Sequence, residues 1–225
     1  MILLAIDTTG KNGSVALARV ERGGDCNPIE VVVLAGGTFS AQMVPQIAEL
    51  LLKHGFSRRD IEAFAVASGP GSFTGLRVGL SAIKALAEVL HKPIAAVSLL
   101  EAVAIASGRQ GSLLAALDAS RGEIYSGEYE VSGDSTRLVA ERLLTAEEFM
   151  ASAKGRVIIT PDSVVAEVAK AAGLTVVEIE RPRSDWIAKL GWKKIQAGLT
   201  VSAEALDANY IRHTDAEIFS KPGAR

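Results

Sequence analysis

One stretch, SGPGSFTGLRVG at residues 68–79, constrains the fold more than any other part of the chain. It follows a short apolar run at residues 63–67, which is typical of a buried strand, and leads into apolar residues at helical spacing from Leu76 to Leu90. Three glycines and a proline between strand and helix predict a tight turn with backbone conformations closed to other residues. A strand, a glycine turn and a helix N-terminus also present free backbone N–H groups, which favour anions.

The spacing of these glycines matches neither common phosphate-binding motif. A P-loop has a second glycine five residues after the first, with a lysine directly after it. Here Thr74 stands five residues after Gly69, and Lys84 lies well inside the expected helix. The dinucleotide fingerprint fails because Gly75 lies one residue too far from Gly71. On spacing alone we favour a structural turn, which lets the helix pack closely on the sheet, over a ligand site. The expected turn residues are Gly69, Pro70, Gly71 and Gly75.

Composition limits the class of protein. The chain has 225 residues, 48% of them hydrophobic, enough for one large domain or two small ones with a substantial core. A formal net charge of −2 argues against a protein that coats nucleic acid but leaves room for a local basic patch. The single cysteine, Cys26, excludes an internal disulfide and fits a reducing cytosol. No run approaches the roughly 20 apolar residues of a membrane span, so we expect a soluble, cytoplasmic protein with no membrane partner.

Hydrophobic periodicity predicts the order of the elements. Expected strands lie at residues 2–6, 14–20, 29–34, 63–67, 94–97, 113–117, 123–131, 137–144, 157–160 and 175–179. Expected helices lie at residues 42–53, 76–90, 98–107, 163–172 and 184–197. Thr145 with Glu148, and Ser98 with Glu101, have the spacing of capping boxes that start helices.

Both halves of the chain begin with strands and continue by alternating strands with helices, which suggests two related lobes with mixed sheets. The polar segment at residues 108–112 lies between strongly apolar elements and is the expected boundary. It divides the chain into an N-terminal lobe at residues 1–107 and a C-terminal lobe at residues 108–225. The tail of the second lobe is expected to pack back on the first.

Five motifs follow one another along the chain. They are IDTT at residues 6–9, SGPGSFTGLR at 68–77, SLLEA at 98–102, DASRGEIY at 118–125 and YIR at 210–212. Together they closely resemble the TsaB family, also called YeaZ, over essentially the whole chain. The resemblance implies an α/β fold of the actin-like, sugar-kinase-like and Hsp70-like (ribonuclease H-like) type. Such a fold has two lobes, each with a mixed sheet flanked by helices.

The resemblance also implies a function. TsaB-like proteins act in making threonylcarbamoyladenosine beside the anticodon of tRNA, as partners of the paralogous catalytic subunit TsaD and of the ATPase TsaE. We therefore expect a non-catalytic scaffold that binds TsaD, forms a homodimer in its absence and meets tRNA only through the complex. The chain itself should require no cofactor, whereas ATP or ADP has a place at the cleft or the interface of the complex.

The sequence offers no catalytic machinery and no metal site. The three histidines, His54, His91 and His213, have no helical pair spacing, and no HExxH motif occurs. The remaining candidates are Asp7, Thr8 and Thr9, in the turn that faces the interlobe cleft in this fold and contacts nucleotide phosphates in related kinases. A turn closed by its own side-chain hydrogen bonds is the reading that we favour for these three residues.

The helices expected at residues 42–53 and 76–90 carry apolar residues on more than one face, and the second is rich in small residues. The family pairs these helices with their counterparts in TsaD or in a second TsaB. We expect the partner interface at Met43, Ile47, Leu50, Leu76, Arg77, Gly79, Leu80 and Ile83. The alternative, of nearly equal weight, is that the small residues accommodate the sheet of the same chain.

Three further alternatives stay open from the sequence. The chain could be a stand-alone ATP-dependent phosphotransferase of the same fold, although no base for that chemistry can be named. A nucleic-acid-binding module is disfavoured by the acidic balance. The polar segment with Asp118, Arg121, Glu123 and Tyr125 is explained by ordinary turn chemistry, with a contact to the cleft as the sharper alternative.

Overall fold

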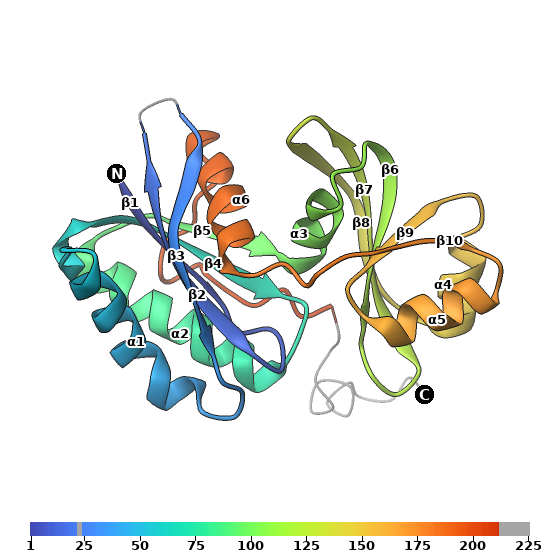
Figure 1. The fold of residues 1–225 in the computed structure, drawn as a ribbon, viewed down its shortest axis with the longest axis horizontal. Helices are drawn as coiled ribbons and strands as arrows, with labels where there is room; N and C mark the ends of the chain where they lie inside the picture. The colour runs from blue at the N-terminus through green and yellow to red at the C-terminus, as the bar shows by residue number, and fades with distance from the viewer. Residues whose placement is uncertain (22–23, 212–225) are drawn as a thin grey trace, which may run out of the picture.

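The computed structural model describes residues 1–21 and 24–211, and it contains two five-stranded mixed sheets flanked by helices. This arrangement confirms the fold class expected from the sequence. Figure 1 shows the two lobes side by side, with the short helix α3 (Leu99–Ala106) between them. Arg212, the last residue of the YIR motif, lies outside the described residues.

The first sheet has the strand order β3-β2-β1-β4-β5. Its strands are β1 (Ile2–Asp7), β2 (Gly13–Val20), β3 (Cys26–Leu34), β4 (Ile61–Gly69) and β5 (Ile94–Ser98). The first three strands form an antiparallel meander, and β4 and β5 are parallel to β1.

The second sheet repeats this connectivity, with the order β10-β9-β6-β7-β8. Its strands are β6 (Gly111–Asp118), β7 (Glu123–Ser132), β8 (Ser135–Thr145), β9 (Val157–Thr160) and β10 (Thr175–Glu178). Here β6, β7 and β8 form the meander, while β9 and β10 are parallel to β6. The similarity of the two halves that the strand order suggested is therefore a repeated topology.

Strand side chains alternate in size on the two faces of the first sheet. In β1, the large residues Leu4 and Ile6 pack against α1 (Phe39–Lys53) and α2 (Phe73–Leu90). Leu3 and Ala5 point to the opposite face, where alanines from β2 and β4 predominate. Alternation of this kind is the strand periodicity of two residues. The small residues on the second face allow another helix to approach closely.

That helix is α6 (Ser184–Gln196), which packs on β1, β2, β4 and β5. A Cβ at Gly191 would lie only 2.4 Å from the Cβ of Ala65, so the helix lies almost against the strands. The prediction that residues 108–225 form the second lobe is therefore wrong for this helix. Its periodicity marks an apolar face but does not say which sheet covers that face.

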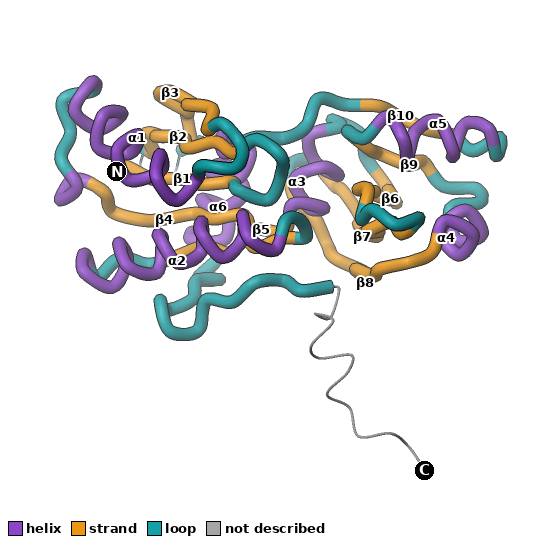
Figure 2. The backbone as a smooth tube through the Cα atoms, turned by 90° about the horizontal axis from the view of Figure 1, so that it is seen from below, coloured by secondary structure: helices purple, strands orange, loops and turns teal. Residues whose placement is uncertain are grey.

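The chain after α6 also lies on the first lobe. Val201 pairs with Ile94 of β5, and the Asn209 N–H donates to the Ser68 carbonyl at 2.7 Å. Figure 2 shows this segment running alongside α2 and β5 toward the second lobe. The second lobe is completed by α4 (Ala146–Ser152) and α5 (Ser163–Ala171), which cover the face of its sheet away from α3.

Of the two capping boxes predicted from the sequence, one is confirmed and the other is incomplete. Thr145 and Glu148 form the expected capping box at the start of α4. Ser98 caps α3 by accepting from the Leu100 N–H, but Glu101 binds Thr136 and Lys194 instead of completing a box. A short 3₁₀ turn, η1 (Arg58–Asp60), precedes β4. Within the described residues, no helix combines the length and apolar character that crossing a membrane requires.

Candidate functional site

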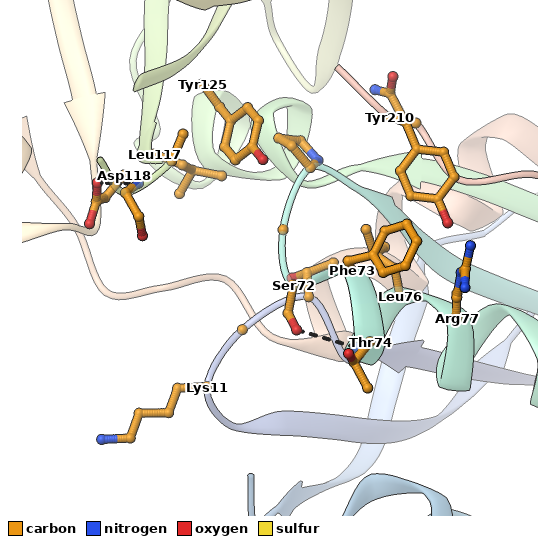
Figure 3. A pocket seen from close by; sticks show the side chains of 18 of the residues that line it. Lys11, Ser72, Phe73, Thr74, Leu76, Arg77, Leu117, Asp118, Tyr125 and Tyr210 are labelled. Atoms are coloured by element: carbon orange, nitrogen blue, oxygen red, sulfur yellow. Dashed lines mark hydrogen bonds between the residues drawn. The ribbon is translucent and has the colours of Figure 1, made fainter. Parts of the chain in front are cut away.

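A cleft of about 1360 Å³ lies between the two lobes, and the SGPGSFTGLR segment forms one of its walls. Thr9, Gly10 and Lys11 from the β1–β2 loop lie beside that wall. The β6–β7 turn contributes residues from the second lobe, and the chain after α6 closes one side. Figure 3 shows Tyr125 and Asp118 of the second lobe across the cleft from Ser72 and Phe73.

The glycines of this wall allow the turn to lie directly on the β1–β2 loop. A Cβ at Gly71 would lie 2.4 Å from the Thr9 carbonyl oxygen, and one at Gly75 would lie 2.0 Å from that of Thr8. Gly69 has φ +121°, a conformation that side chains rarely adopt. The glycines are thus required by close packing within the chain.

Hydrogen bonds fix the start of α2 at the same place. The Ser72 N–H donates to the Thr9 carbonyl at 2.8 Å, and the Ser72 hydroxyl accepts from the Gly75 N–H at 3.3 Å, which caps the helix. The Thr8 hydroxyl donates to the Gly75 carbonyl at 2.8 Å. The loop after β1 and the first turn of α2 therefore form one rigid unit at the edge of the cleft.

Asp7 and Thr8 do not line the cleft, although both were candidates for a nucleotide contact. The Asp7 carboxylate accepts from the Thr9 N–H at 2.8 Å and from the Thr9 hydroxyl at 2.6 Å, which closes the turn upon itself. Burial raises the pKa of Asp7, and the hydrogen bonds from Thr9 and the charge of Arg181 oppose this only in part. Of the three candidates, only Thr9 borders the cleft.

The β6–β7 turn lines the cleft from the second lobe, as expected if this segment contacts the cleft and is not only an ordinary surface turn. Ser120 and Arg121 have φ values of 62° and 56°, in the left-handed region that few non-glycine residues adopt. The Asp118 carboxylate accepts from the Ser120 N–H at 2.8 Å, and the Asp118 N–H donates to Asp162 at 2.8 Å. These bonds hold Arg121 at the border of the cleft.

A stack of planar groups stands where the chain after α6 meets α2. The guanidinium carbon of Arg77 lies 3.8 Å from the centre of the Phe73 ring, and the ring centres of Phe73 and Tyr210 are 5.4 Å apart. Figure 3 shows the three side chains together at one side of the cleft. Sequence reasoning missed this stack, because Tyr210 is brought to Phe73 only by the return of the chain to the first lobe.

A partly buried polar cluster around Glu141 joins both lobes to the returning chain. The Glu141 carboxylate accepts from the Ser98 hydroxyl at the end of β5 and from the Tyr129 hydroxyl in β7. It also accepts from the Asn209 amide at 2.5 Å. Burial, and then the neighbouring Glu141 charge, raise the pKa of Tyr129, so this phenol stays a hydrogen-bond donor.

The expected partner interface needs correction. Of its eight residues only Arg77 is exposed, whereas the other seven are buried on the sheet-facing sides of α1 and α2, Leu80 being 5% exposed. Gly79 is small because a Cβ there would lie 2.3 Å from the Thr8 hydroxyl oxygen. Gly79 thus accommodates the chain's own loop, as the alternative interpretation held for the small residues of this helix, whereas Ser81 and Ala85 are exposed. The misassigned residues are Met43, Ile47, Leu50, Leu76, Gly79, Leu80 and Ile83.

Other residues of the same two helices do present apolar side chains to solvent. On α1, Leu52 is 80% exposed and Val44 also projects outward. On α2, Val78, Ala82, Ala85 and Val89 follow one another at spacings of four, three and four residues. The first two are half-buried against the core, whereas Ala85 is exposed and Val89 is 72% exposed. This spacing forms an apolar stripe along the outer side of a helix and is typical of a seam between packed helices.

Comparisons with known proteins agree with the motifs. The model of the TsaD family, described as tRNA N6-adenosine threonylcarbamoyltransferase, matches residues 33–214. The chain is 28% identical over 228 residues to the tRNA threonylcarbamoyladenosine biosynthesis protein TsaB of Escherichia coli (strain K12), covering 96% of each. It is 37% identical over 132 residues to the protein of that name from Bacillus subtilis (strain 168), covering 58% of this chain but only 56% of that relative.

Solved structures extend the similarity to three dimensions. YeaZ from Pseudomonas aeruginosa superposes with a TM-score of 0.76 at 25% identity. The superposition covers 93% of this chain and 100% of that one. The match therefore includes both lobes and the interlobe cleft.

Proposed function

The chain belongs to the TsaD family, and we propose that within it the chain is a non-catalytic partner subunit in tRNA threonylcarbamoyladenosine biosynthesis. Its task would be to bind a catalytic TsaD-type subunit and hold it competent for threonylcarbamoyl transfer to tRNA. The name shared by its relatives supports the pathway. The surface of α1 and α2 supports the role of partner.

The observation that carries the proposal is the apolar stripe on α2 beside exposed apolar residues on α1. The two helices contact each other on one face of the first sheet, and both have exposed apolar side chains. Large exposed apolar side chains gathered at one place mark an interaction surface more often than a solvated one. A paralogous subunit built on the same fold can offer a matching pair of helices, which then pack as a bundle.

A role without catalysis is supported by the burial and hydrogen bonding of Asp7 and Thr8 in the turn after β1. In an enzyme that transfers phosphate at this place, a carboxylate has to be free to meet the substrate or its metal ion. Here the Asp7 side chain is 4% exposed and bound to Thr9, and Thr8 is bound to Gly75. This placement disfavours the alternative of a stand-alone phosphotransferase.

The role of a TsaD partner also determines what we propose for TsaE, for nucleotide and for the homodimer. We propose that TsaE joins the TsaD-bound form, that ATP or ADP is held by the complex and not required by this chain alone, and that the protein works in the cytoplasm. Without TsaD, the stripe on α2 would pair two copies of the chain. An isologous pairing of this kind uses the same patch on both copies.

The test is Val89→Asp, measured by capture of a tagged TsaD-type partner. A charge forced into an apolar helix seam is expected to weaken capture at least about tenfold while the subunit stays folded. The matched control is Val164→Asp, an exposed valine on α5 far from the stripe, which should capture the partner as the native chain does. Leu80→Asp is unsuitable because it buries a charge in the core and should unfold the chain.

Capture by the Val89→Asp variant at the native level would refute the assignment of this surface. Size-exclusion chromatography of the same variant without TsaD adds a second readout. The native chain should elute as a dimer and the variant as a monomer. Equal elution volumes would show that the stripe does not pair two copies.

A further inference from the structure

The interlobe cleft gathers positive charge in a protein whose formal net charge is −2. Its charged lining residues are Lys11, Arg77, Arg121, Arg181, Asp118 and Asp162. The two carboxylates already accept hydrogen bonds from main-chain N–H groups, and Asp162 also lies 3.5 Å from Arg181. The four cations outnumber the two carboxylates, so the cleft carries a surplus of positive charge. A low-dielectric cleft concentrates the field of such charges on a negatively charged ligand.

Planar side chains border the same cleft. Phe73 is 39% exposed, and its contacts with Tyr210 and Arg77 hold it in place at the cleft wall. Tyr125 lines the cleft from the second lobe. Aromatic faces and arginine guanidinium planes are the groups on which unpaired bases stack in proteins that bind single strands.

The size of the cleft separates two ligands of this chemistry. Pockets for single small molecules measure about 300–1,000 Å³. The cleft, at about 1360 Å³, is larger than that range, and it is lined by residues of both lobes. It can therefore accept several linked nucleotide units more readily than it can enclose one free nucleotide.

From these three observations we propose that the cleft binds an unpaired stretch of RNA strand. Lys11 and Arg121, on opposite lobes, would neutralise phosphates, and Phe73 with Tyr210 would offer a stacking surface to a base. The inference rests on the proposed function, because RNA enters as the substrate in the description of the TsaD family. It adds that this subunit contacts the tRNA directly once the complex has formed.

The test measures tRNA affinity of the assembled complex with TsaD as a function of salt concentration. The double variant combines Lys11→Gln with Arg121→Asn, and asparagine is chosen because it tolerates the left-handed backbone at position 121. Each lost phosphate contact lowers the slope of log affinity against log salt by about 0.7 for a single strand. The double variant should therefore lose about 1.4 from the slope and bind tRNA about tenfold more weakly at low salt.

The matched control is Arg109→Gln, an exposed arginine outside the cleft, which should leave both the slope and the affinity unchanged. A further variant, Phe73→Leu, keeps an apolar side chain but removes the ring. It should weaken tRNA binding about tenfold with no change in the salt slope, since stacking carries no charge. Native affinity and slope in both the double variant and Phe73→Leu would overturn the proposal.

Two competitors distinguish the source of the ligand. A short single-stranded oligoadenylate should displace tRNA from the complex, while a duplex of equal length should not. Displacement by AMP at the same nucleotide concentration would instead show a site for a free nucleotide and overturn the assignment to a strand.

Capture of TsaD by the double variant must be at the native level. If the native chain fails to capture TsaD, the proposed function fails, whereas normal capture with unchanged tRNA binding refutes the cleft alone.

Discussion

Replacing Gly75 by alanine tests whether the glycines of the central turn are required by packing within the chain. The added Cβ would lie 2.0 Å from the Thr8 carbonyl oxygen, whereas ordinary contact begins at 3.4 Å. The helix and the loop would have to separate by the difference, 3.4 − 2.0 = 1.4 Å. The neighbour is a backbone carbonyl in the loop directly after β1, which a hydrogen bond ties to α2, so no flexible side chain can absorb this shift.

The magnitude follows from three contributions. Overpacking of a well-packed site costs about 1–3 kcal/mol. Separation also breaks the buried bond from the Thr8 hydroxyl to the Gly75 carbonyl, which costs about 1–3 kcal/mol. Alanine returns at most about 1 kcal/mol through its higher helix propensity. Gly75→Ala should therefore lose about 3 kcal/mol of unfolding free energy, which lowers the melting temperature by about 6–12 °C in a chain of this size.

The assay is urea unfolding followed by circular dichroism, with Ser81→Ala as the control. Ser81 lies on the exposed side of the same helix, where alanine should raise the unfolding free energy by a few tenths of a kcal/mol. A Gly75→Ala variant as stable as the native chain would refute the reasoning. It would mean that the loop after β1 yields without cost and that the turn is not rigid.

Two further predictions concern buried polar groups. Asp7→Asn keeps a side-chain oxygen that can accept from Thr9. Because the pKa of Asp7 is raised in the folded state, the native chain loses stability as the pH rises above the unfolded value of 3.8. The variant has no carboxyl group at this position and does not lose stability in this way. The variant should therefore gain unfolding free energy relative to the native chain as the pH rises from 3 to 7, and the opposite trend in urea titrations would contradict the prediction. Tyr129→Phe removes one donor to Glu141, which keeps its bonds from Ser98 and Asn209, so thermal unfolding should show a loss of about 1 kcal/mol. No measurable loss would show that the cluster does not stabilise the lobe junction.

Much of the fold was predictable because its signals are local. The strand at Val157–Thr160 was located to the residue, and most other elements were located to within about three residues at each end. The capping box of Thr145 and Glu148 uses only neighbouring residues, so the sequence alone sufficed. The motifs also gave the resemblance to the TsaB family, which the comparisons confirm.

The candidate site was only partly predictable. The SGPGSFTGLR segment and the turn around Asp118 were singled out, but they lie in different lobes and no local pattern shows that they face each other. The burial of Leu80 and its neighbours was misjudged for a related reason. Periodicity on a helix shows that two sides are apolar, and only the position of the sheet decides which of them is covered.

The sequence by itself therefore determined the elements, their order and the close-packed turn at the centre of the first lobe. These depend on backbone preferences and on spacing within a few residues. The tertiary structure alone decided that α6 returns to the first sheet and that Tyr210 meets Phe73. It also decided that Glu141 ties both lobes to the returning chain. These contacts join residues far apart along the chain, and their stability depends on shape and burial that no short stretch encodes.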